Sequence, residues 1–190
     1  MKQLKTILFL TVTTCLIISC GRSDMAPKGD SLKKGKVKMV TLPFDVTATG
    51  NYTYVGPDTL PVAKCVAPLN MWRAIVDGKG TGTPVGDFTM HFDFCGDSLS
   101  FYGNTQAYLT FSEGDTLFIS GAGRVFDGRL DDHPAFVVSY WRDPFVILGG
   151  TGKYEGATGD IITDDYNSSE DPNSHHHWKG TITMKKGKLQ

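Results

Sequence analysis

Apolar and polar residues alternate along several short stretches of this chain, which is the pattern of strands that bury one face. In residues 88–94 every second residue is Phe or Met, and in residues 178–184 Trp178, Ile182 and Met184 fall on one face. No window of 11 or more residues keeps apolar residues at helical spacing. The pattern predicts an all-β domain of eight or nine strands, arranged as an antiparallel sandwich or barrel. The other strand-like runs are residues 37–46, 52–55, 71–81, 107–111, 116–125, 136–141 and 161–166.

The first 35 residues do not share this pattern. Lys2 and Lys5 precede an uncharged, mostly apolar run at residues 6–18, which is too short to span a bilayer but suits the core of a signal peptide. The run ends in Ile-Ile-Ser-Cys-Gly, which resembles the bacterial lipoprotein signal, so we expect cleavage before Cys20 and acylation of its thiol. An ordinary secretory peptide with an incidental cysteine is the alternative. The predicted parts are a signal peptide at residues 1–19, a flexible tether at residues 20–35 and a β-barrel domain at residues 36–190.

The expected modification predicts where the protein is found. Each buried methylene group contributes about 0.8 kcal/mol, so a multiply acylated Cys20 would hold the protein on a membrane. We therefore expect a lipid-anchored protein of the cell envelope, at the outer membrane or cell surface of a diderm bacterium.

The charges of the chain are unevenly distributed. Lys and Arg number 19 and Asp and Glu 20 in total, but between residues 40 and 184 there are 8 basic and 18 acidic residues. An acidic body repels phosphate backbones, so nucleic acid is not an expected partner. The basic residues that flank the body would either rest against anionic lipid headgroups or serve as solubilising charges.

Two cysteines remain in the body of the chain, Cys65 and Cys95. An exported protein reaches an oxidising compartment, where a disulfide between them can form. Two free thiols packed as small apolar side chains are the alternative.

Several segments carry a resemblance to a known group of proteins. Residues 109–118 (LTFSEGDTLF) form a strand, a Gly-Asp turn and a second strand, and the glycine-rich residues 149–159 (GGTGKYEGATG) and residues 178–182 (WKGTI) follow them. Together with residues 80–89 (GTGTPVGDFT), they resemble the allene oxide cyclase barrel-like and dirigent-like group. The resemblance implies a calycin-like, eight-stranded, antiparallel up-and-down barrel. It carries over no catalytic residue, and it implies activity weakly because one barrel hosts unrelated functions.

The glycine-rich segment does not fit a nucleotide-binding loop. A dinucleotide loop places a third glycine where this chain has Glu155, and it opens a helix, whereas the residues that follow have a strand pattern. We therefore assign the glycines to structure. Gly149, Gly150 and Gly152 are expected to adopt positive φ in a tight turn, and Gly156 and Gly159 to allow close approach of the backbone.

The tract His175-His176-His177 contains the candidate metal ligands. On a strand, His175 and His177 would share one face, and with His133 or Asp164 they would form a zinc or copper site. The alternative is a set of exposed histidines at the end of a hairpin.

The candidate ligand pocket is aromatic. Its residues are Trp72, Tyr140, Trp141 and Trp178, which would either line a pocket for an apolar or ring-shaped ligand or fill the barrel as core. The function that we predict is a lipid-anchored barrel that binds a small apolar ligand or a partner protein of the envelope, and no cofactor is implied. A cyclase or isomerase acting inside the barrel is one alternative, and it would need an open cavity with two or more buried polar groups. Metal capture by the histidine tract is the other.

Overall fold

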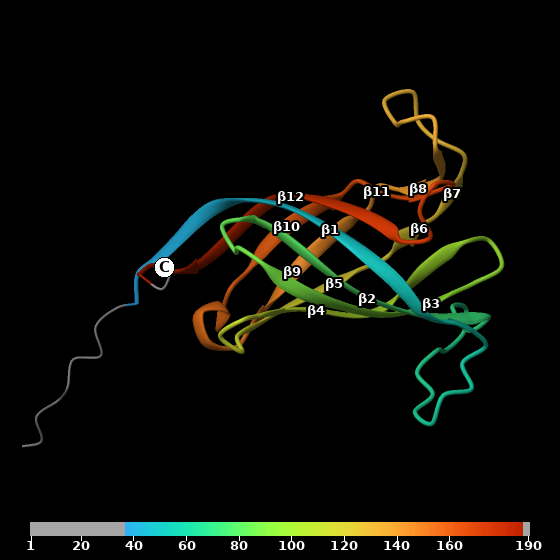
Figure 1. Cartoon of the computed structure of the whole chain (residues 1–190). Helices are drawn as coiled ribbons and strands as arrows, with labels where there is room; N and C mark the ends of the chain where they lie inside the picture. The colour runs from blue at the N-terminus through green and yellow to red at the C-terminus, as the bar shows by residue number, and fades with distance from the viewer. Residues whose placement is uncertain (1–36, 188–190) are drawn as a thin grey trace, which may run out of the picture. The chain divides into compact units, whose positions relative to one another are not determined.

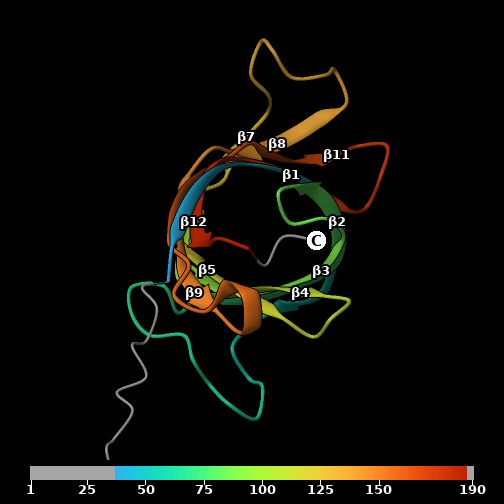
Figure 2. The same cartoon turned by 90° about the vertical axis from the view of Figure 1, so that its left-hand side faces the viewer.

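The computed structural model describes residues 37–187, which form one antiparallel β-sheet closed into a barrel (Figures 1 and 2). Within this range the one helical segment is the short 3-10 turn η1, and no helix is long and apolar enough to cross a membrane. The expected signal peptide, tether and acylated Cys20 lie outside the described residues. The strands are β1 (Met39–Gly56), β2 (Trp72–Thr83), β3 (Phe88–Gly96), β4 (Phe101–Phe111), β5 (Thr116–Gly121), β6 (Gly123–Arg124), β7 (Phe126–Asp127), β8 (Val137–Trp141), β9 (Pro144–Gly150), β10 (Gly159–Thr163), β11 (Asp165–Ser168) and β12 (Ser174–Lys185), and η1 is Gly152–Tyr154.

The barrel has eight strands, as the sequence predicts. Strands β8 and β9 are separated by two residues, and β10 and β11 by one, so that each pair forms one long bent strand. Together with β1 to β5 and β12 these make eight, and β6 and β7 are short extensions beyond β5. The first and last strands close the ring, from Met39 opposite Lys185 to Gly50 opposite Ser174. Figure 2 shows the closed ring of strands.

The predicted alternation places the core inside the barrel. Phe44, Val46 and Ala48 in β1 are buried, and the residues between them are exposed. In β12, Trp178, Ile182 and Met184 are buried in the same way. Burial of these side chains from opposite walls of the ring supplies the hydrophobic stabilisation of the fold. In β3, Phe92 and Phe94 face the interior, whereas Asp93 and Cys95 on the other face are also buried, because Lys64 and Cys65 of the loop at residues 57–71 lie against them.

The glycine-rich segment forms a turn at the end of the barrel where β1 begins. Tyr154 in η1 is buried there and packs against Phe111, with ring centroids 4.7 Å apart. Gly149 and Gly152 have positive φ, as expected (121° and 54°). Gly150 and Gly156 exchange the expected roles, because Gly156 has a φ of 72° and no neighbour within 4 Å, whereas Gly150 lies against the backbone of Thr116. The segment thus places the buried Tyr154 ring at this end of the barrel. The fifth glycine, Gly159, packs closely against the backbone of Thr181, as expected.

Candidate functional site

A cavity of about 470 Å³ lies inside the barrel at the end where β1 finishes and β2 begins. Four connections gather at this end, residues 57–71, 97–100, 128–136 and 169–173, and the two longest are the loops on the right of Figure 1. The wall is mostly aromatic and aliphatic, with a few polar groups. It is formed by Tyr52, Val55, Trp72, Ala74, Val76, Phe92, Phe94, Ser100, Tyr102, Thr105, Val125, Trp141, Phe145, Asp165, Asn167 and His176.

Two of the four predicted pocket residues line this cavity, namely Trp72 and Trp141. Trp178 is 1% exposed and packs edge-to-face on Phe92 as part of the core, but it does not line the cavity. Tyr140 lies on the outer side of the barrel, where its ring stacks on Phe126 with centroids 5.5 Å apart. Because Tyr140 and Trp141 are consecutive in β8, their side chains point to opposite sides of the sheet, and only one of them can line the interior.

The polar centre of the cavity wall is the pair of Asp165 and His176. Nδ1 of His176 lies 2.9 Å from Oδ2 of Asp165, and the two residues are 9% and 1% exposed, respectively. The indole Nε1 of Trp178 donates to Asp165 at 3.0 Å, and the backbone N–H of His177 donates to it at 3.1 Å. The carboxylate therefore has hydrogen-bond donors from three residues around it, which is how a buried charge is stabilised.

Ser174 extends this network on the far side of His176. Its Oγ lies 2.9 Å from Nε2 of His176 and 3.1 Å from the carbonyl oxygen of Gly50. Carboxylate, imidazole and hydroxyl follow one another in the order found in hydrolases. Ser174, however, is fully buried and is not part of the cavity wall. Its hydroxyl is not presented to a ligand, so the arrangement is a hydrogen-bonded support for His176 and not a nucleophile.

A second titratable pair lies where β4 faces the break between β8 and β9. The phenol of Tyr102, a cavity residue, donates to Oδ2 of Asp143 at 2.8 Å. Burial raises the pKa of Asp143, and the negative charge of Asp165 raises it further. Burial, together with the charge of Asp143, also raises the pKa of Tyr102. Both effects favour the protonated forms of this pair.

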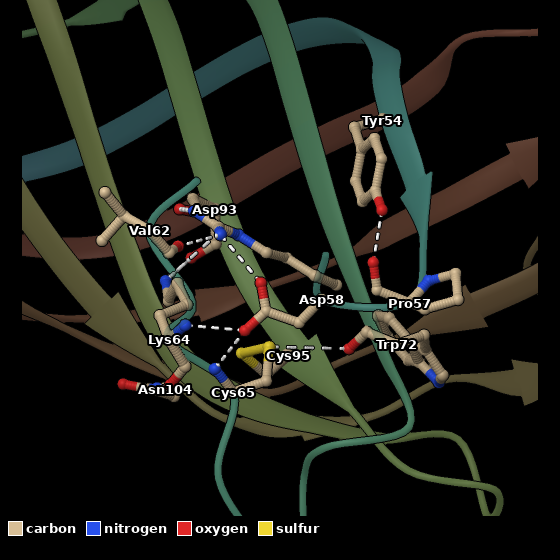
Figure 3. The surroundings of a disulfide bond; sticks show 11 residues. Tyr54, Pro57, Asp58, Val62, Lys64, Cys65, Trp72, Asp93, Cys95 and Asn104 are labelled. Atoms are coloured by element: carbon tan, nitrogen blue, oxygen red, sulfur yellow. Dashed lines mark hydrogen bonds and ion pairs between the residues drawn. A yellow bond between two sulfur atoms is a disulfide. The ribbon is translucent and has the colours of Figure 1, made fainter. Parts of the chain in front are cut away.

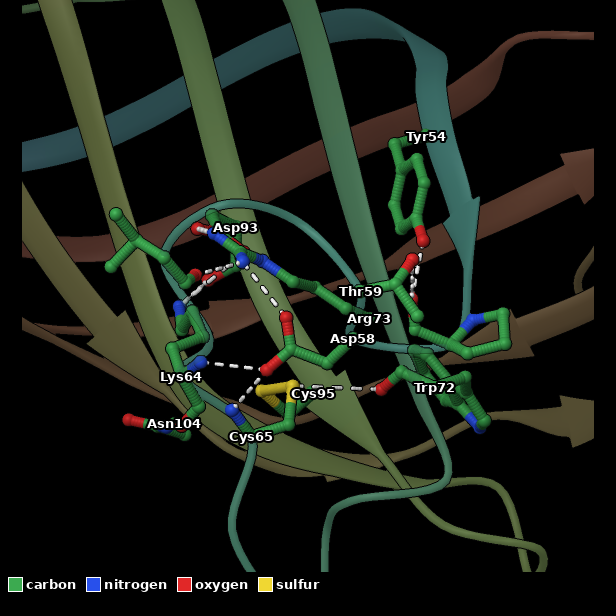
Figure 4. Close-up of polar contacts among 12 residues, drawn as sticks. Tyr54, Asp58, Thr59, Lys64, Cys65, Trp72, Arg73, Asp93, Cys95 and Asn104 are labelled. Atoms are coloured by element: carbon green, nitrogen blue, oxygen red, sulfur yellow. Dashed lines mark hydrogen bonds and ion pairs between the residues drawn. A yellow bond between two sulfur atoms is a disulfide. The ribbon is translucent and has the colours of Figure 1, made fainter.

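The rim of the cavity is held by a cluster around Arg73 (Figures 3 and 4). The guanidinium donates to both carboxylate oxygens of Asp93, at 2.8 Å and 2.6 Å, and to Oδ1 of Asp58 at 2.9 Å. Oδ2 of Asp58 accepts the backbone N–H groups of Lys64 and Cys65, and these two bonds are the largest cause of its lowered pKa. These contacts fix the loop at residues 57–71 beside Trp72.

Cys65 and Cys95 are joined by a disulfide at the same place (Figure 3). Cys95 is in β3 directly opposite Arg73 of β2, so the covalent bond and the ion pairs act on one loop. The Nζ of Lys64 donates to the backbone carbonyl of Asp93 at 2.6 Å. The loop is thus bound to the barrel wall by a disulfide, ion pairs and hydrogen bonds.

The two predicted metal ligands lie elsewhere, on the outer face of β12. A wide, open hollow of about 930 Å³ crosses this face, and His175 and His177 are among its residues. Nε2 of His175 lies 3.2 Å from Asp171, and Nε2 of His177 lies 2.8 Å from Asp45, so the two rings have separate carboxylate partners. Within residues 37–187, no three His, Cys, Asp or Glu side chains are grouped so that they could hold a metal ion.

The histidine that reaches the cavity is the middle one of the tract. His176 follows the same alternation as Trp178, and extending the inward face of β12 by two residues would have found it. Asp165 belongs to the strand-like run at residues 161–166, and alternation places it on the same face as Ile161, but as a carboxylate in an acidic stretch it was not selected as an interior residue.

Comparison with known proteins agrees with the geometry of the barrel. A scan against protein-family models and a search of curated proteins found no match to this chain. The solved structure of the pterocarpan synthase dirigent protein GePTS1 is similar, with a TM-score of 0.51 and 15% identity over 80% of this chain and 90% of that chain. That of the pterocarpan synthase dirigent protein PsPTS1 matches with a TM-score of 0.46 and 12% identity over 79% of this chain and 97% of that chain. The first similarity shows that the domain has a barrel fold similar to that of this dirigent protein.

Proposed function

We propose that the protein is a lipid-anchored barrel of the cell envelope that binds a small, ring-containing, largely apolar ligand in its interior cavity. The observation that carries the proposal is the cavity of about 470 Å³ with a mostly aromatic and aliphatic wall and a few buried polar groups. Pockets for small molecules typically have volumes of roughly 300–1,000 Å³ and this same kind of lining. The dirigent-like fold supports a binding or substrate-handling role for the interior.

The test of ligand binding is a titration of the purified full chain with small ring-containing compounds, followed by tryptophan fluorescence. Trp72 and Trp141 line the cavity, so an occupant should change their emission. We expect Trp141→Leu to weaken binding of any hit at least tenfold, since it removes a large contact surface. The matched control is Phe118→Leu on the outer face, where the ring is 41% exposed, and it should leave binding unchanged. Binding that is insensitive to Trp141→Leu would place the ligand elsewhere.

Anchoring through Cys20 has its own test. The sequence at residues 17–21 supports it, and intact mass spectrometry of the mature protein should find acyl groups on an N-terminal Cys20. Cys20→Ser should move the protein from the membrane fraction to the soluble fraction. If the mature N-terminus carried no acyl group, the proposed anchor would be rejected, and the proposal of ligand binding in the cavity would not be affected.

A second candidate is an enzyme of the cyclase or isomerase type. The specific observation in its favour is that the cavity wall carries Asp165 and His176, with the hydrogen-bonded Tyr102 and Asp143 as a second titratable pair. Groups of this kind move protons in general acid–base catalysis. If this candidate holds, a bound compound is recovered as an isomer, and His176→Gln stops the conversion while binding persists. If every bound compound is recovered unchanged, the enzyme candidate is rejected and the binding role remains.

A further inference from the structure

The polar pair inside the cavity has no net charge. Ser174 donates its single hydroxyl hydrogen to the carbonyl oxygen of Gly50, 3.1 Å away, so Nε2 of His176 donates to the Ser174 oxygen at 2.9 Å. Nδ1 of His176 faces Oδ2 of Asp165 across 2.9 Å, with a single proton between them. Whether that proton is on the imidazole or on the carboxyl group, the charges of the pair sum to zero.

Other polar groups of the wall have partners within the protein. The hydroxyl of Tyr102 donates to Asp143, and that of Thr105 donates to the carbonyl oxygen of Gly121 at 2.7 Å. None of the sixteen wall residues, all in the described part of the chain, is Lys or Arg. A charged ligand would therefore lose its water shell without gaining a counter-charge, which is costly. The interior suits an uncharged ligand.

Apolar side chains are exposed around the open end of this cavity. They are Val55, the sequence neighbours of the wall residues Trp72 and Ser100, and two valines of the loop at residues 57–71. Together they form the apolar rim, which consists of Val55, Val62, Val66, Met71, Leu99 and Phe101. Val62 and Val66 are the most exposed, at 75% and 69%. Exposed apolar groups that gather in one place mark a contact surface.

Backbone polar groups beneath the rim are bonded within the protein. The carbonyl oxygen of Val62 accepts from Arg73 at 2.7 Å, and the N–H groups of Leu99 and Phe101 donate to Oδ1 of Asp97 at 2.8 and 3.0 Å. Unpaired backbone groups are costly in a hydrocarbon phase. These segments therefore meet the main requirement for contact with lipid, because their polar groups are already satisfied.

A basic side chain lies beside the rim. The guanidinium of Arg124 is 5.1 Å from the ring centroid of Phe101 and 5.2 Å from that of Phe126. Aromatic rings next to a long basic side chain are typical of the boundary between lipid and water, where the cation reaches the headgroups. This arrangement favours a lipid surface over a protein partner. The charged loop at residues 128–136 projects from the opposite side of this end (Figure 1) and is not part of the rim.

The chain before β1 is long enough for this end to meet the membrane. The 19 residues from Cys20 to Lys38 extend to at most roughly 65 Å. Strand β1, with 18 residues, is about 60 Å long. An anchor at Cys20 therefore permits the open end, at the far end of β1, to contact the same bilayer.

We propose that the apolar rim contacts a lipid bilayer and that the cavity takes up an uncharged, ring-containing ligand from it. This inference rests on the proposed ligand binding and adds the charge and the source of the ligand. The rim places the opening of the cavity at the lipid, so a molecule dissolved there reaches the aromatic interior without crossing water.

Contact is tested with the full chain on phosphatidylcholine vesicles whose acyl chains carry bromine, which quenches tryptophan emission at short range. Val62→Trp places a reporter in the rim, and Leu148→Trp places one on the outer face of β9, where Leu148 is also exposed. We expect brominated lipid to reduce the emission gained with Val62→Trp at least twofold relative to ordinary lipid, and to leave that gained with Leu148→Trp unchanged. Equal emission of Val62→Trp in the two lipids would overturn the membrane contact and leave the rim to a protein partner. Equal quenching of both variants would also overturn it, because the rim would then not be the preferred contact.

Uptake is tested with vesicles that contain N-phenyl-1-naphthylamine, an uncharged ring compound whose binding is followed by energy transfer from Trp72 and Trp141. The double variant Val62→Asp and Val66→Asp should slow uptake from the vesicles at least fivefold, while its affinity for the probe in lipid-free buffer equals that of the wild type. Phe118→Asp, on the outer face, is the matched control and should change neither. Uptake at the wild-type rate in the double variant would overturn the route from lipid.

The preference for an uncharged ligand is tested with 1-anilinonaphthalene-8-sulfonate, which adds one sulfonate to the same rings. It should bind at least tenfold more weakly than the uncharged probe, and equal affinity would overturn the preference. If neither probe bound, the proposed function itself would be contradicted, whereas quenching of the Val62→Trp variant would still support the membrane contact.

Discussion

Asp165 and His176 hydrogen-bond inside the barrel, with 2.9 Å between Oδ2 and Nδ1, although each has a neighbour of the same residue type on the outer face. Asp164 binds Arg142 outside the barrel, and His177 binds Asp45 there. One step along the chain therefore separates a carboxylate at the surface from one that is hydrogen-bonded in the interior. Asp164 and His177 are therefore surface controls for the contribution of the interior pair to the free energy of unfolding.

Asp165→Asn should lower the free energy of unfolding by about 2–3 kcal/mol, since an amide cannot accept from all the donors that the carboxylate satisfies. Asp164→Asn should cost less than about 1 kcal/mol, because its ion pair with Arg142 is exposed. Urea unfolding followed by tryptophan fluorescence measures both. Similar losses in the two variants would show that the interior network does not stabilise the fold.

The disulfide between Cys65 and Cys95 should contribute about 3–4 kcal/mol by restricting the unfolded chain, for cysteines 30 residues apart in sequence. The double variant Cys65→Ser and Cys95→Ser should lose that stability. Urea unfolding of the wild type with and without a reductant should give the same difference. A reductant should leave the double variant unaffected, and any effect there would point to another thiol.

Arg73→Met should reduce stability most at neutral pH, by about 3–5 kcal/mol, because it leaves the buried Asp93 without its partner. In the wild type burial opposes ionisation of Asp93, but the hydrogen bonds of Arg73 and the charge of Lys64 lower its pKa below the ordinary value of 3.8. A lowered pKa in the folded state stabilises the protein above the unfolded pKa, and this stabilisation disappears as pH falls through the folded pKa.

The difference between wild type and Arg73→Met should therefore shrink as pH is lowered from 6 through 4 toward 3. Unfolding midpoints measured across that range test the sign. A difference that grew on acidification would mean that the ion pair does not control this pH dependence. Arg124→Met, at a guanidinium placed over Phe101 and Phe126 at the surface, is the control and should show little change with pH.

Tyr154→Phe should leave stability unchanged or raise it by about 1 kcal/mol, because the Tyr154 hydroxyl is buried with no hydrogen-bond partner in the described part of the chain. The same change at Tyr102 should cost about 1 kcal/mol, since it removes a bond to Asp143. Thermal unfolding of the two variants side by side makes the comparison. A loss at Tyr154 as large as that at Tyr102 would indicate an unrecognised partner, such as an ordered water.

The aromatic residues show what residue type and strand alternation each predict about the cavity wall. Trp72 and Trp141 were selected as pocket candidates, with core as the alternative, and both line the interior cavity. Tyr140 was selected with them on residue type alone, although its place next to Trp141 put it on the other face. In the histidine tract, the metal-site hypothesis selected His175 and His177, whereas the alternation in β12 places His176 inside.

The order of apolar and polar residues along the chain by itself determined the all-β class, a range of eight or nine strands and the inward side of most of them. This information is local, because side chains alternate at every residue of a strand. The composition of the cavity wall was decided by the tertiary structure alone. Tyr102, Asp165 and His176 belong to β4, β11 and β12, and only the closure of β1 on β12 and the bends beside Asp143 and Asp164 bring them around one space. Contacts between residues far apart in sequence depend on register and curvature, which no short stretch of sequence specifies.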